Sequence, residues 1–347
     1  MKTKIIKLNK KKFSIDEIKI AVETIIKGGI VAFPTETVYG LGANALNVKA
    51  VEKIYEVKGR PKDNPSIVHI ADKKDVYRLA SEIPKKAEGL IKKFWPGPLT
   101  LVFKKSKTVP YITTAGLDTV AIRMPDNKIA LALIRESKVP IAAPSANLAG
   151  KPSPTSAEHV IHDLYGKIDV IIDAGKTRIG IESTVLDLTT EPPTLLRPGG
   201  ITLEKLENFL GKIKLHPAVK AEKKIGEIIA KSPGMKYKHY APEAELIVIE
   251  GKTKAIRKKI QELVNEYNAQ GKRVGVMTAS EYNYDVDVIK FVGSDLKTIA
   301  KNLFKTFREF DREKVDVILA ESVKTSGMGL AIMNRLKKAS GYNIVKT

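Results

Sequence analysis

The sequence predicts an α/β protein of two domains, the first with a mixed, twisted sheet and the second with a small doubly wound sheet. Its 347 residues exceed the size at which a single hydrophobic core usually stops growing. In the first part, strands and helices mix without strict alternation, which favours a mixed sheet. Later they alternate, which is typical of a parallel sheet. We therefore expect domains at 1–211 and 244–347, joined by a linker at 212–243.

The first domain is expected to open with a helix at Ser14, because Glu17 stands three residues later, at the spacing of a capping box. Apolar residues at helical spacing follow, and Gly28 and Gly29 end the helix. An apolar strand at 30–33 comes next, and the glycines around Tyr39 indicate turns. Further helices are expected at 48–57, 74–81, 84–94, 127–136 and 203–210. Further strands are expected at 66–70, 99–103, 119–123, 141–143, 170–173, 183–188 and 194–196.

The linker is rich in lysine and proline and ends in the aromatic segment SPGMKYKHYAP, which begins at Ser232. A plain tether would be rich in glycine and serine or in charge, so this composition indicates a segment that docks. The second domain is expected to contain strands at 246–249, 273–278, 288–291 and 315–320. Its helices are expected at 254–269, 296–310 and 330–339.

Composition excludes several classes of protein. The chain has no cysteine, which rules out disulfides, zinc–thiolate sites, iron–sulfur clusters and thiol catalysis and fits a cytoplasmic location. No apolar run approaches the ~20 residues of a membrane span, and the basic N-terminus lacks the apolar stretch of a secretory signal. The net charge of +21 favours polyanionic partners, either phosphorylated ligands or nucleic acid.

Three familiar site patterns are not supported. The segment from Asp173 to Thr177 ends in GKT, but Val170 stands where a phosphate-binding loop needs its first glycine. No GxGxxG follows a strand, so a dinucleotide site is not predicted. His159 and His162 lack an accompanying carboxylate motif, which favours a structural role over zinc binding.

Polar residues instead gather at the ends of several expected strands. Thr35 follows the first strand, and Arg123 ends another, where an arginine can clamp a carboxylate through two hydrogen bonds. Hydroxyl, amide and cationic groups occupy comparable positions at Ser145, Asn147, Ser183 and Arg197, and Lys58, Arg60 and Lys62 alternate in a nearby loop. With no Ser-His-Asp order and no evident carboxylate pair, this set suits orientation and charge neutralisation, as in phosphoryl or adenylyl transfer.

Seven segments in this order closely resemble the threonylcarbamoyl-AMP synthase family. They are PTETVYGLG at 34–42, KGRPKDNP at 58–65, WPGPLT at 95–100, RMP at 123–125, PSAN at 144–147, ESTV at 182–185 and LRPGG at 196–200. The resemblance implies a YrdC-like first domain and a Rossmann-like second domain of the two-domain, Sua-type branch. It also implies synthesis of threonylcarbamoyl-AMP and pyrophosphate from L-threonine, bicarbonate or CO₂, and ATP. The resemblance further implies that other proteins would use the product for N6-threonylcarbamoyl modification of adenosine 37 in tRNA.

The resemblance also implies roles for single residues. Lys58, Arg60 and Arg123 would be catalytic. L-Threonine would be held by Thr35, His69, Arg123 and Ser183. ATP would be held by Lys58, Arg60, Lys62, Thr119, Ser145, Asn147, Ser153, Arg197 and Tyr237. Mg²⁺ would accompany ATP, tRNA and the threonylcarbamoyl-transfer proteins would act downstream, no membrane would be involved, and the protein would be a monomer.

Two alternatives remain open from the residues alone. A strongly basic chain could grip tRNA or double-stranded RNA without any turnover. Tyr237 could close the linker over the nucleotide site as a lid, or the linker aromatics could simply pack the domains together.

Overall fold

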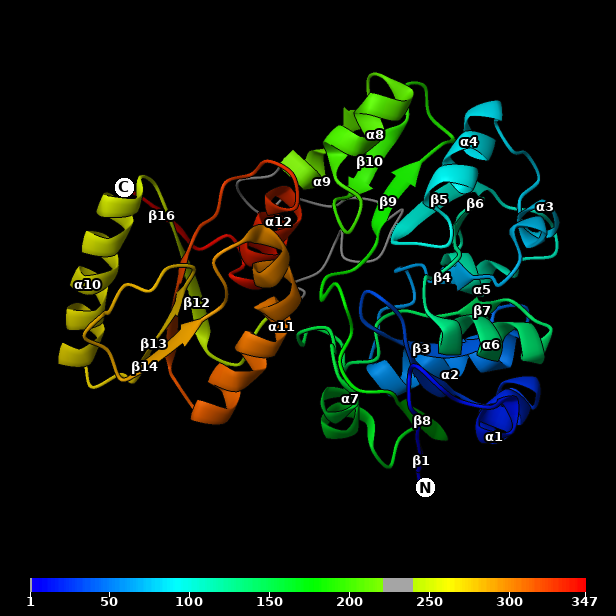
Figure 1. Cartoon of the computed structure of the whole chain (residues 1–347), viewed down its shortest axis with the longest axis horizontal. Helices are drawn as coiled ribbons and strands as arrows, with labels where there is room; N and C mark the ends of the chain where they lie inside the picture. The colour runs from blue at the N-terminus through cyan, green and yellow to red at the C-terminus, as the bar shows by residue number, and fades with distance from the viewer. Residues whose placement is uncertain (1, 221–239) are drawn as a thin grey trace. The chain divides into compact units, whose positions relative to one another are not determined.

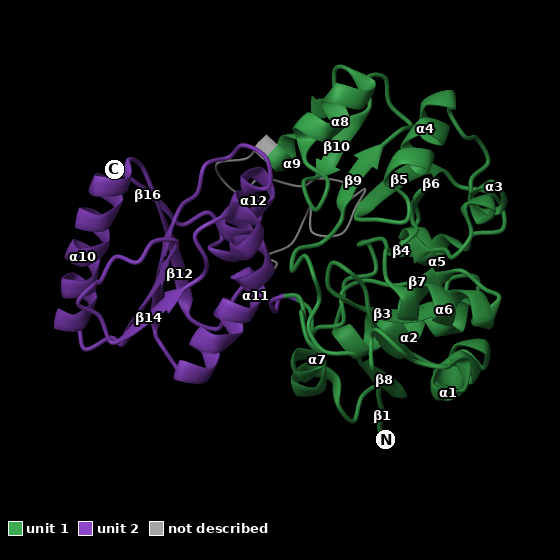
Figure 2. Ribbon diagram, in the orientation of Figure 1, with its two compact units in different colours: residues 1–149, 153–220, 227–236 green, residues 150–152, 221–226, 237–347 purple. Residues whose placement is uncertain are grey.

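The computed structural model describes residues 2–220 and 240–347. The chain divides into two compact units, which Figure 2 draws in different colours. Unit 1 holds residues 1–149 and 153–220, and unit 2 holds residues 150–152 together with the C-terminal part of the chain up to residue 347.

Unit 1 is built on an eleven-stranded sheet. Figure 1 shows its strands together with the helices around them. The strand order is β1-β8-β2-β3-β7-β4-β6-β5-β9-β10-β11. The strands are β1 (Lys4–Lys7), β2 (Val31–Pro34), β3 (Tyr39–Asn44), β4 (Ile67–His69), β5 (Leu99–Lys104), β6 (Thr119–Arg123), β7 (Ile141–Ala142), β8 (Val170–Asp173), β9 (Thr184–Asp187), β10 (Thr194–Arg197) and β11 (Lys214–Leu215). Because β4 pairs with β6 in parallel and β5 pairs with β6 antiparallel, the prediction of a mixed sheet is confirmed.

Helices α1 (Ile15–Ile26) and α6 (Lys128–Ser137) cover one face of the β2–β8 part of this sheet, and α2 (Val48–Lys58) and α7 (Ala157–Leu164) cover the other. The further helices of unit 1 are α3 (Val76–Leu79), α4 (Lys85–Phe94), α5 (Tyr111–Thr114), α8 (Leu203–Leu210) and α9 (Pro217–Lys220), with a 3₁₀ turn η1 (Lys73–Asp75). Successive residues of a strand point to opposite faces. Accordingly, Val31 and Phe33 pack with α1 and α6, whereas Ala32 packs with α2 and α7.

The expected turns around Tyr39 are wrong, because these residues form strand β3, antiparallel to β2. The glycines serve close packing there. A Cβ on Gly42 would lie 2.6 Å from the Phe33 ring and 2.7 Å from the Ile141 side chain. Two short edge strands, β1 and β11, were also not predicted. The capping box at Ser14 is present, and the Ser14 amide donates to Glu17 Oε2 at 2.7 Å.

Unit 2 is a small doubly wound domain with a fully parallel sheet in the order β14-β13-β15-β12-β16. Its strands are β12 (Glu245–Glu250), β13 (Val274–Thr278), β14 (Val288–Phe291), β15 (Val317–Glu321) and β16 (Ile344–Lys346). Its helices are α10 (Thr253–Ala269), α11 (Leu296–Glu313) and α12 (Gly329–Ala339). Figure 1 shows α10 on one side of the sheet and α11 and α12 on the other. Of these elements, only β16 was not predicted.

Three residues expected in the first domain, Gly150–Pro152, lie in unit 2. The Ala241 amide donates to the Gly150 carbonyl at 2.9 Å, and Arg308 Nη2 donates to the Pro152 carbonyl at 2.5 Å. Lys151 also forms an ion pair with Glu243, with 3.2 Å between Nζ and Oε1. These contacts explain why a short piece of sequence from the first half belongs to the second unit.

No helix within the described ranges is both long enough and apolar enough to cross a membrane.

Candidate active site

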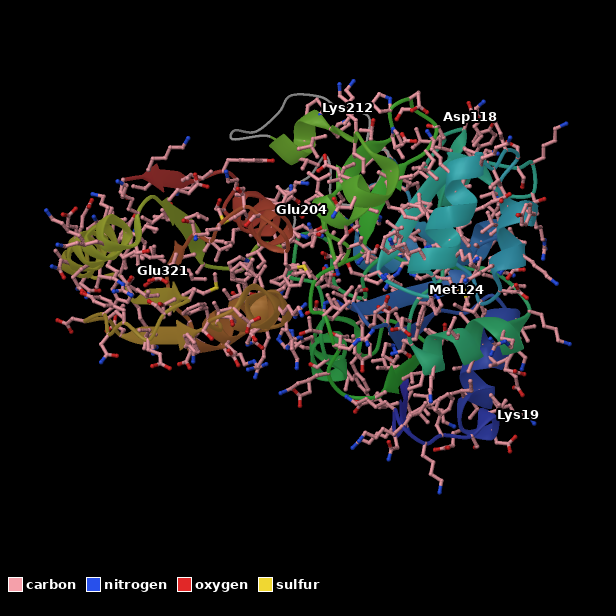
Figure 3. The ribbon with its side chains drawn as sticks, turned by 45° about the horizontal axis from the view of Figure 1, so that its top comes forward. Lys19, Asp118, Met124, Glu204, Lys212 and Glu321 are labelled. Atoms are coloured by element: carbon pink, nitrogen blue, oxygen red, sulfur yellow. The ribbon has the colours of Figure 1, made fainter. Side chains whose placement is uncertain are left out.

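The seven polar segments converge within unit 1. Gly40 of the first segment forms an antiparallel bridge with Ser145 of the fifth. The Ala149 amide, just beyond the fifth segment, donates to the carbonyl of Lys58, which begins the second. The Gly97 amide of the third segment donates to the carbonyl of Met124 in the fourth. Met124 directly follows Arg123 and is labelled in Figure 3.

His69 and Arg123 stand side by side because they are register partners at the ends of the parallel strands β4 and β6. Both side chains are buried. Arg123 Nε donates to the Gly97 carbonyl at 3.3 Å, and Arg123 Nη2 lies 2.7 Å from Oε2 of Glu36 in an ion pair. The guanidinium is therefore held in place by the first and third segments together.

His69 is neutral at physiological pH in this setting. Its Nδ1 lies 3.2 Å from the Ile67 carbonyl. Burial, and then the positive charge of Arg123, lower the pKa of His69 to about 3. An uncharged imidazole beside a guanidinium leaves Arg123 as the local cation, so a bound carboxylate would meet a single positive group.

Ser183 joins three segments. Its hydroxyl lies 2.8 Å from Oγ1 of Thr100 and accepts a hydrogen bond from Arg197 Nη2 at 3.2 Å. Arg197 Nε also donates to the Ser183 carbonyl at 3.1 Å. Gly199 permits this close approach, because a Cβ there would lie 2.4 Å from the backbone of Glu182 and Ser183. Glycine is required by the contact itself.

Thr35 lies in the turn directly after β2, fixed by local hydrogen bonds. Its hydroxyl donates to the Val38 carbonyl at 2.6 Å and lies 2.8 Å from Oγ1 of Thr37. It also accepts from the Thr37 amide at 3.1 Å. These bonds hold a tight turn of three polar residues, Thr35, Glu36 and Thr37, all of them buried.

Lys58 ties α2 to the fifth segment. Its ammonium, at the C-terminus of the helix, donates to the Ser145 carbonyl at 2.5 Å and to the Asn147 carbonyl. Arg60 follows the left-handed Gly59, and its guanidinium donates to the carbonyls of Asn64 and Pro65 at 3.2 and 3.0 Å. These contacts position the two cations.

Ser153 contacts the Ser183 cluster, since its hydroxyl donates to Glu182 Oε1 at 2.6 Å and Glu182 directly precedes Ser183. One set of contacts thus joins Lys58 to Ser145 and Asn147, and another joins Ser153 to the Ser183 cluster. Nine of the predicted site residues take part in this arrangement: Thr35, Lys58, His69, Arg123, Ser145, Asn147, Ser153, Ser183 and Arg197. Arg60 lies two residues beyond Lys58, with its guanidinium bonded to its own loop.

Two predicted ATP residues, Thr119 and Lys62, are not brought into this arrangement. Thr119 begins β6, whereas Arg123 ends it, so about 13 Å of strand separates them. Lys62 is exposed on its loop. Tyr237 lies outside the described residues, so its predicted contact with the nucleotide stays a prediction.

Two acids and a hydroxyl were not among the predicted site residues. Glu36 pairs with Arg123, Glu182 accepts from Ser153, and Thr100 contacts Ser183. All three lie inside the recognised segments, and Glu36 carries a signal that could have found it. Glu36 lies between two threonines just after a buried strand. A carboxylate buried there is costly unless a cation pairs with it.

The described residues contain no group of three or more His, Asp or Glu side chains that could hold a metal ion. His159 accepts the Thr155 amide at 3.2 Å, and His162 pairs with Asp163, so both histidines of α7 have partners within their own region. A magnesium ion at this site would take most of its ligands from substrate phosphates and water, as Mg²⁺ commonly does.

Two family profiles match the chain. Residues 23–199 match the family described as telomere recombination, Sua5_yciO_yrdC, and residues 201–341 match the threonylcarbamoyl-AMP synthase C-terminal domain. A threonylcarbamoyl-AMP synthase of Pyrococcus abyssi is 58% identical over 95% of this chain and 96% of its own length. One from Bacillus subtilis is 53% identical over 95% of this chain and 94% of its own length.

Solved structures of the same family share their fold with this chain, over its whole length or part of it. The crystal structure of P. abyssi Sua5 complexed with L-threonine has a TM-score of 0.96 and 56% identity, covering 99% of this chain and 100% of the other. Escherichia coli YciO covers 57% of this chain and 96% of its own, with a TM-score of 0.53 and 27% identity. The likeness to P. abyssi Sua5 extends over both units, whereas that to YciO covers little more than half of the chain.

Proposed function

The chain belongs to the threonylcarbamoyl-AMP synthase family, and on this premise we propose how its residues carry out the reaction. It is a nucleotidyltransferase-type enzyme that uses L-threonine and ATP and makes threonylcarbamoyl-AMP. Bicarbonate or CO₂ is the third reactant in our proposal, and pyrophosphate is the second product. The observation that supports the residue roles is the convergence of the seven segments on Arg123, Lys58 and Ser183 in unit 1.

In this proposal Arg123 binds the threonine carboxylate, because a buried guanidinium can donate two parallel hydrogen bonds to it. His69 lies beside it as a neutral ring, and the hydroxyls of Thr35 and Ser183 orient the rest of the amino acid. Each of these groups is fixed by its own contacts before substrate arrives. Such preorganisation lowers the entropic cost of binding.

Lys58, Arg60 and Lys62 take the triphosphate, while Ser145, Asn147, Ser153 and Arg197 complete the nucleotide site. Thr119, at the far end of β6, has no assigned contact in this arrangement. Negative charge on the pyrophosphate grows as it leaves, so positioned cations stabilise the transition state more than the bound substrate.

The chemical step joins two bound reactants. The carboxylate oxygen of the threonine carbamate attacks the α-phosphorus of ATP, and the bond from that phosphorus to the bridging oxygen of pyrophosphate breaks. Holding both reactants replaces a bimolecular encounter with an intramolecular one, which can contribute on the order of 7–11 kcal/mol. Mg²⁺ would accompany the ATP phosphates and would supply further charge neutralisation.

The product would go to the proteins that transfer the threonylcarbamoyl group to adenosine 37 of tRNA in the cytoplasm, and the enzyme would act as a monomer. The adenylate hydrolyses readily, so the reaction needs water to be kept from the site. The aromatic part of the linker, for which the sequence suggests a lid, lies mostly outside the described residues. The +21 charge would also allow direct contact with tRNA.

Pyrophosphate release tests the proposal. The full-length protein with ATP and Mg²⁺ should release pyrophosphate only when threonine and bicarbonate are both present. Release that ignores either one, or none at all, contradicts the proposal. A protein that only binds RNA would instead show RNA affinity falling steeply with salt and no such dependence.

A further inference from the structure

The segment Gly150–Pro152 lies between two anchored residues of the chain. Before it, the Ala149 amide donates to the carbonyl of Lys58 at 2.9 Å. After it, the Ser153 hydroxyl donates to Oε1 of Glu182 at 2.6 Å, and Ser153 is 1% exposed. The segment itself belongs to unit 2, although residues 149 and 153 on either side belong to unit 1. Contacts that fix its backbone therefore also determine the position from which Ser153 starts.

Arg308, in helix α11, holds the last residue of this segment. Its side chain is buried, and Nη2 donates to the Pro152 carbonyl at 2.5 Å. Hydrogen bonds from a charged donor are among the stronger ones in proteins. The Pro152 carbonyl belongs to the same planar peptide group as the Ser153 amide. A bond to that oxygen therefore fixes the plane from which the Ser153 side chain projects.

The other two residues of the segment are held by the same part of unit 2. Asp311, one turn further along α11, accepts the Glu243 amide at 2.8 Å. The Glu243 carboxylate pairs with Lys151, with 3.2 Å between Oε1 and Nζ. The Ala241 amide donates to the Gly150 carbonyl at 2.9 Å. The segment is thus fixed at each of its three residues, and the contact at its last residue is the one next to the proposed nucleotide site.

Ser153 is flanked by two prolines, which make this part of the chain stiff. Proline fixes its own φ angle, and the residue before a proline is restricted to extended backbone. Ser153 precedes Pro154, whose carbonyl accepts the Tyr39 amide at 2.9 Å. The backbone around Ser153 is thus held by Arg308 on one side and by Tyr39 on the other. If the Arg308 bond is lost, any displacement of the Pro152 carbonyl passes directly to the serine.

We propose that Arg308 is a positioning residue for nucleotide binding, because by fixing the Pro152 carbonyl it holds the Ser153 hydroxyl where ATP meets it. The inference rests on the proposed function, in which Ser153 belongs to the nucleotide site. Arg308 itself touches no reacting atom. Its effect falls on ATP and not on threonine, because Arg123 and Ser183 are held by contacts in which Arg308 takes no part.

A double-mutant cycle in the full-length protein tests the proposal, by calorimetry of ATP and Mg²⁺ binding in the absence of threonine. Arg308→Met keeps the aliphatic volume and removes the donors. A hydrogen bond from a charged group corresponds to about 10- to 150-fold in an equilibrium constant, so ATP affinity should fall by about 10-fold, at the lower end. In a Ser153→Ala background the same substitution should lower ATP affinity less than about threefold, because the serine through which it acts is gone.

Threonine binding and a matched control separate positioning from general damage. In Arg308→Met, threonine affinity should change less than about threefold, since the contacts that hold the threonine residues remain. Arg312→Met replaces an exposed arginine one turn further along α11 and should bind ATP as wild type does. The proposal is overturned if Arg308→Met leaves ATP affinity unchanged, weakens both ligands together, or costs as much affinity in the Ser153→Ala background as in wild type.

Melting temperatures report whether each variant is folded. If Arg308→Met does not fold, the cycle is measured with Arg308→Lys, which keeps the charge but not the planar fork of donors. A loss of ATP affinity that shrinks in the Ser153→Ala background then supports the proposal, and an absent or equal loss overturns it. Failure of wild-type protein to release pyrophosphate with threonine and bicarbonate would instead contradict the proposed function, because the binding cycle does not depend on turnover.

Discussion

Replacing Lys58 with methionine should destabilise unit 1 as well as weaken its reaction with ATP. The Lys58 side chain is 2% exposed, and its ammonium donates to the carbonyls of Ser145 and Asn147. Methionine keeps most of the aliphatic volume but has no N–H to donate. The substitution therefore isolates the two hydrogen bonds that join the end of α2 to the segment after β7.

The expected size of the effect follows from these contacts. A hydrogen bond that involves a charged group contributes about 1.5–3 kcal/mol. Ser145 is only partly buried, so water can replace one bond in part. We therefore take the lower value, about 1.5 kcal/mol, for each of the two bonds and expect the free energy of unfolding to fall by about 3 kcal/mol. For a unit of roughly 200 residues this corresponds to a drop of about 6–12 °C in melting temperature.

Thermal unfolding followed by circular dichroism measures the effect, with Lys62→Met as the matched control. Lys62 lies four residues beyond Lys58, in the loop that follows α2, but is exposed, so its substitution should leave the melting temperature within about 1 °C. Because Lys62 is proposed to bind the triphosphate, the Lys62→Met protein should lose ATP affinity while its melting temperature stays unchanged. A Lys58→Met protein that melts within 2 °C of wild type would refute the reasoning that these two bonds brace the site.

Three further outcomes are expected. Arg123→Ala should raise the Michaelis constant for threonine about 30- to 1,000-fold, because a charge-assisted bidentate contact is lost; an unchanged constant would contradict the assignment. Burial lowers the pKa of His69 to about 3 in the folded protein, whereas the unfolded imidazole titrates near 6.5. Between these pH values the unfolded chain binds a proton that the folded chain does not, so the free energy of unfolding falls as the pH drops. Denaturant unfolding should show about 2 kcal/mol of this loss between pH 7.5 and 5, and His69→Gln should lack that portion. Tyr284→Phe should lower the stability of unit 2 by about 1–2 kcal/mol, because Tyr284 donates to buried Glu321 Oε1 at 2.6 Å, and pyrophosphate release should not change.

Sequence reasoning recovered the elements whose signals are local. The capping box at Ser14 and the apolar strands of both units are set by neighbouring residues, and the structure has them close to the expected bounds. Strand β3 was missed because its glycines suggest turns when only the local sequence is considered. Glycine is needed at Gly42 because the side chains of Phe33 and Ile141, which come from other parts of the chain, leave no room for a Cβ. Edge strands β1 and β16 are short and depend on a single neighbouring strand.

The candidate site follows the same division. Recognisable segments predicted which residues to examine, but partners depend on strand register. His69 stands beside Arg123 because β4 pairs with β6 in that register. Thr119 lies far from Arg123 because the two residues occupy opposite ends of β6. Glu36 was visible in its segment, yet its pairing with Arg123 joins residues 87 positions apart, and only the fold reveals it.

The assignment of Gly150–Pro152 to unit 2 has a consequence for the order of events at the ribosome. The hydrogen bond from Arg308 to the Pro152 carbonyl spans 156 positions. At 5–20 residues per second, Arg308 is synthesised roughly 10–30 s after Pro152. Most of unit 1 can form during that interval, whereas the segment just before Ser153 waits for its last partner. Ribosome-bound chains that stop before residue 308 should therefore expose the peptide bonds of this segment to protease, and chains that extend past it should protect them.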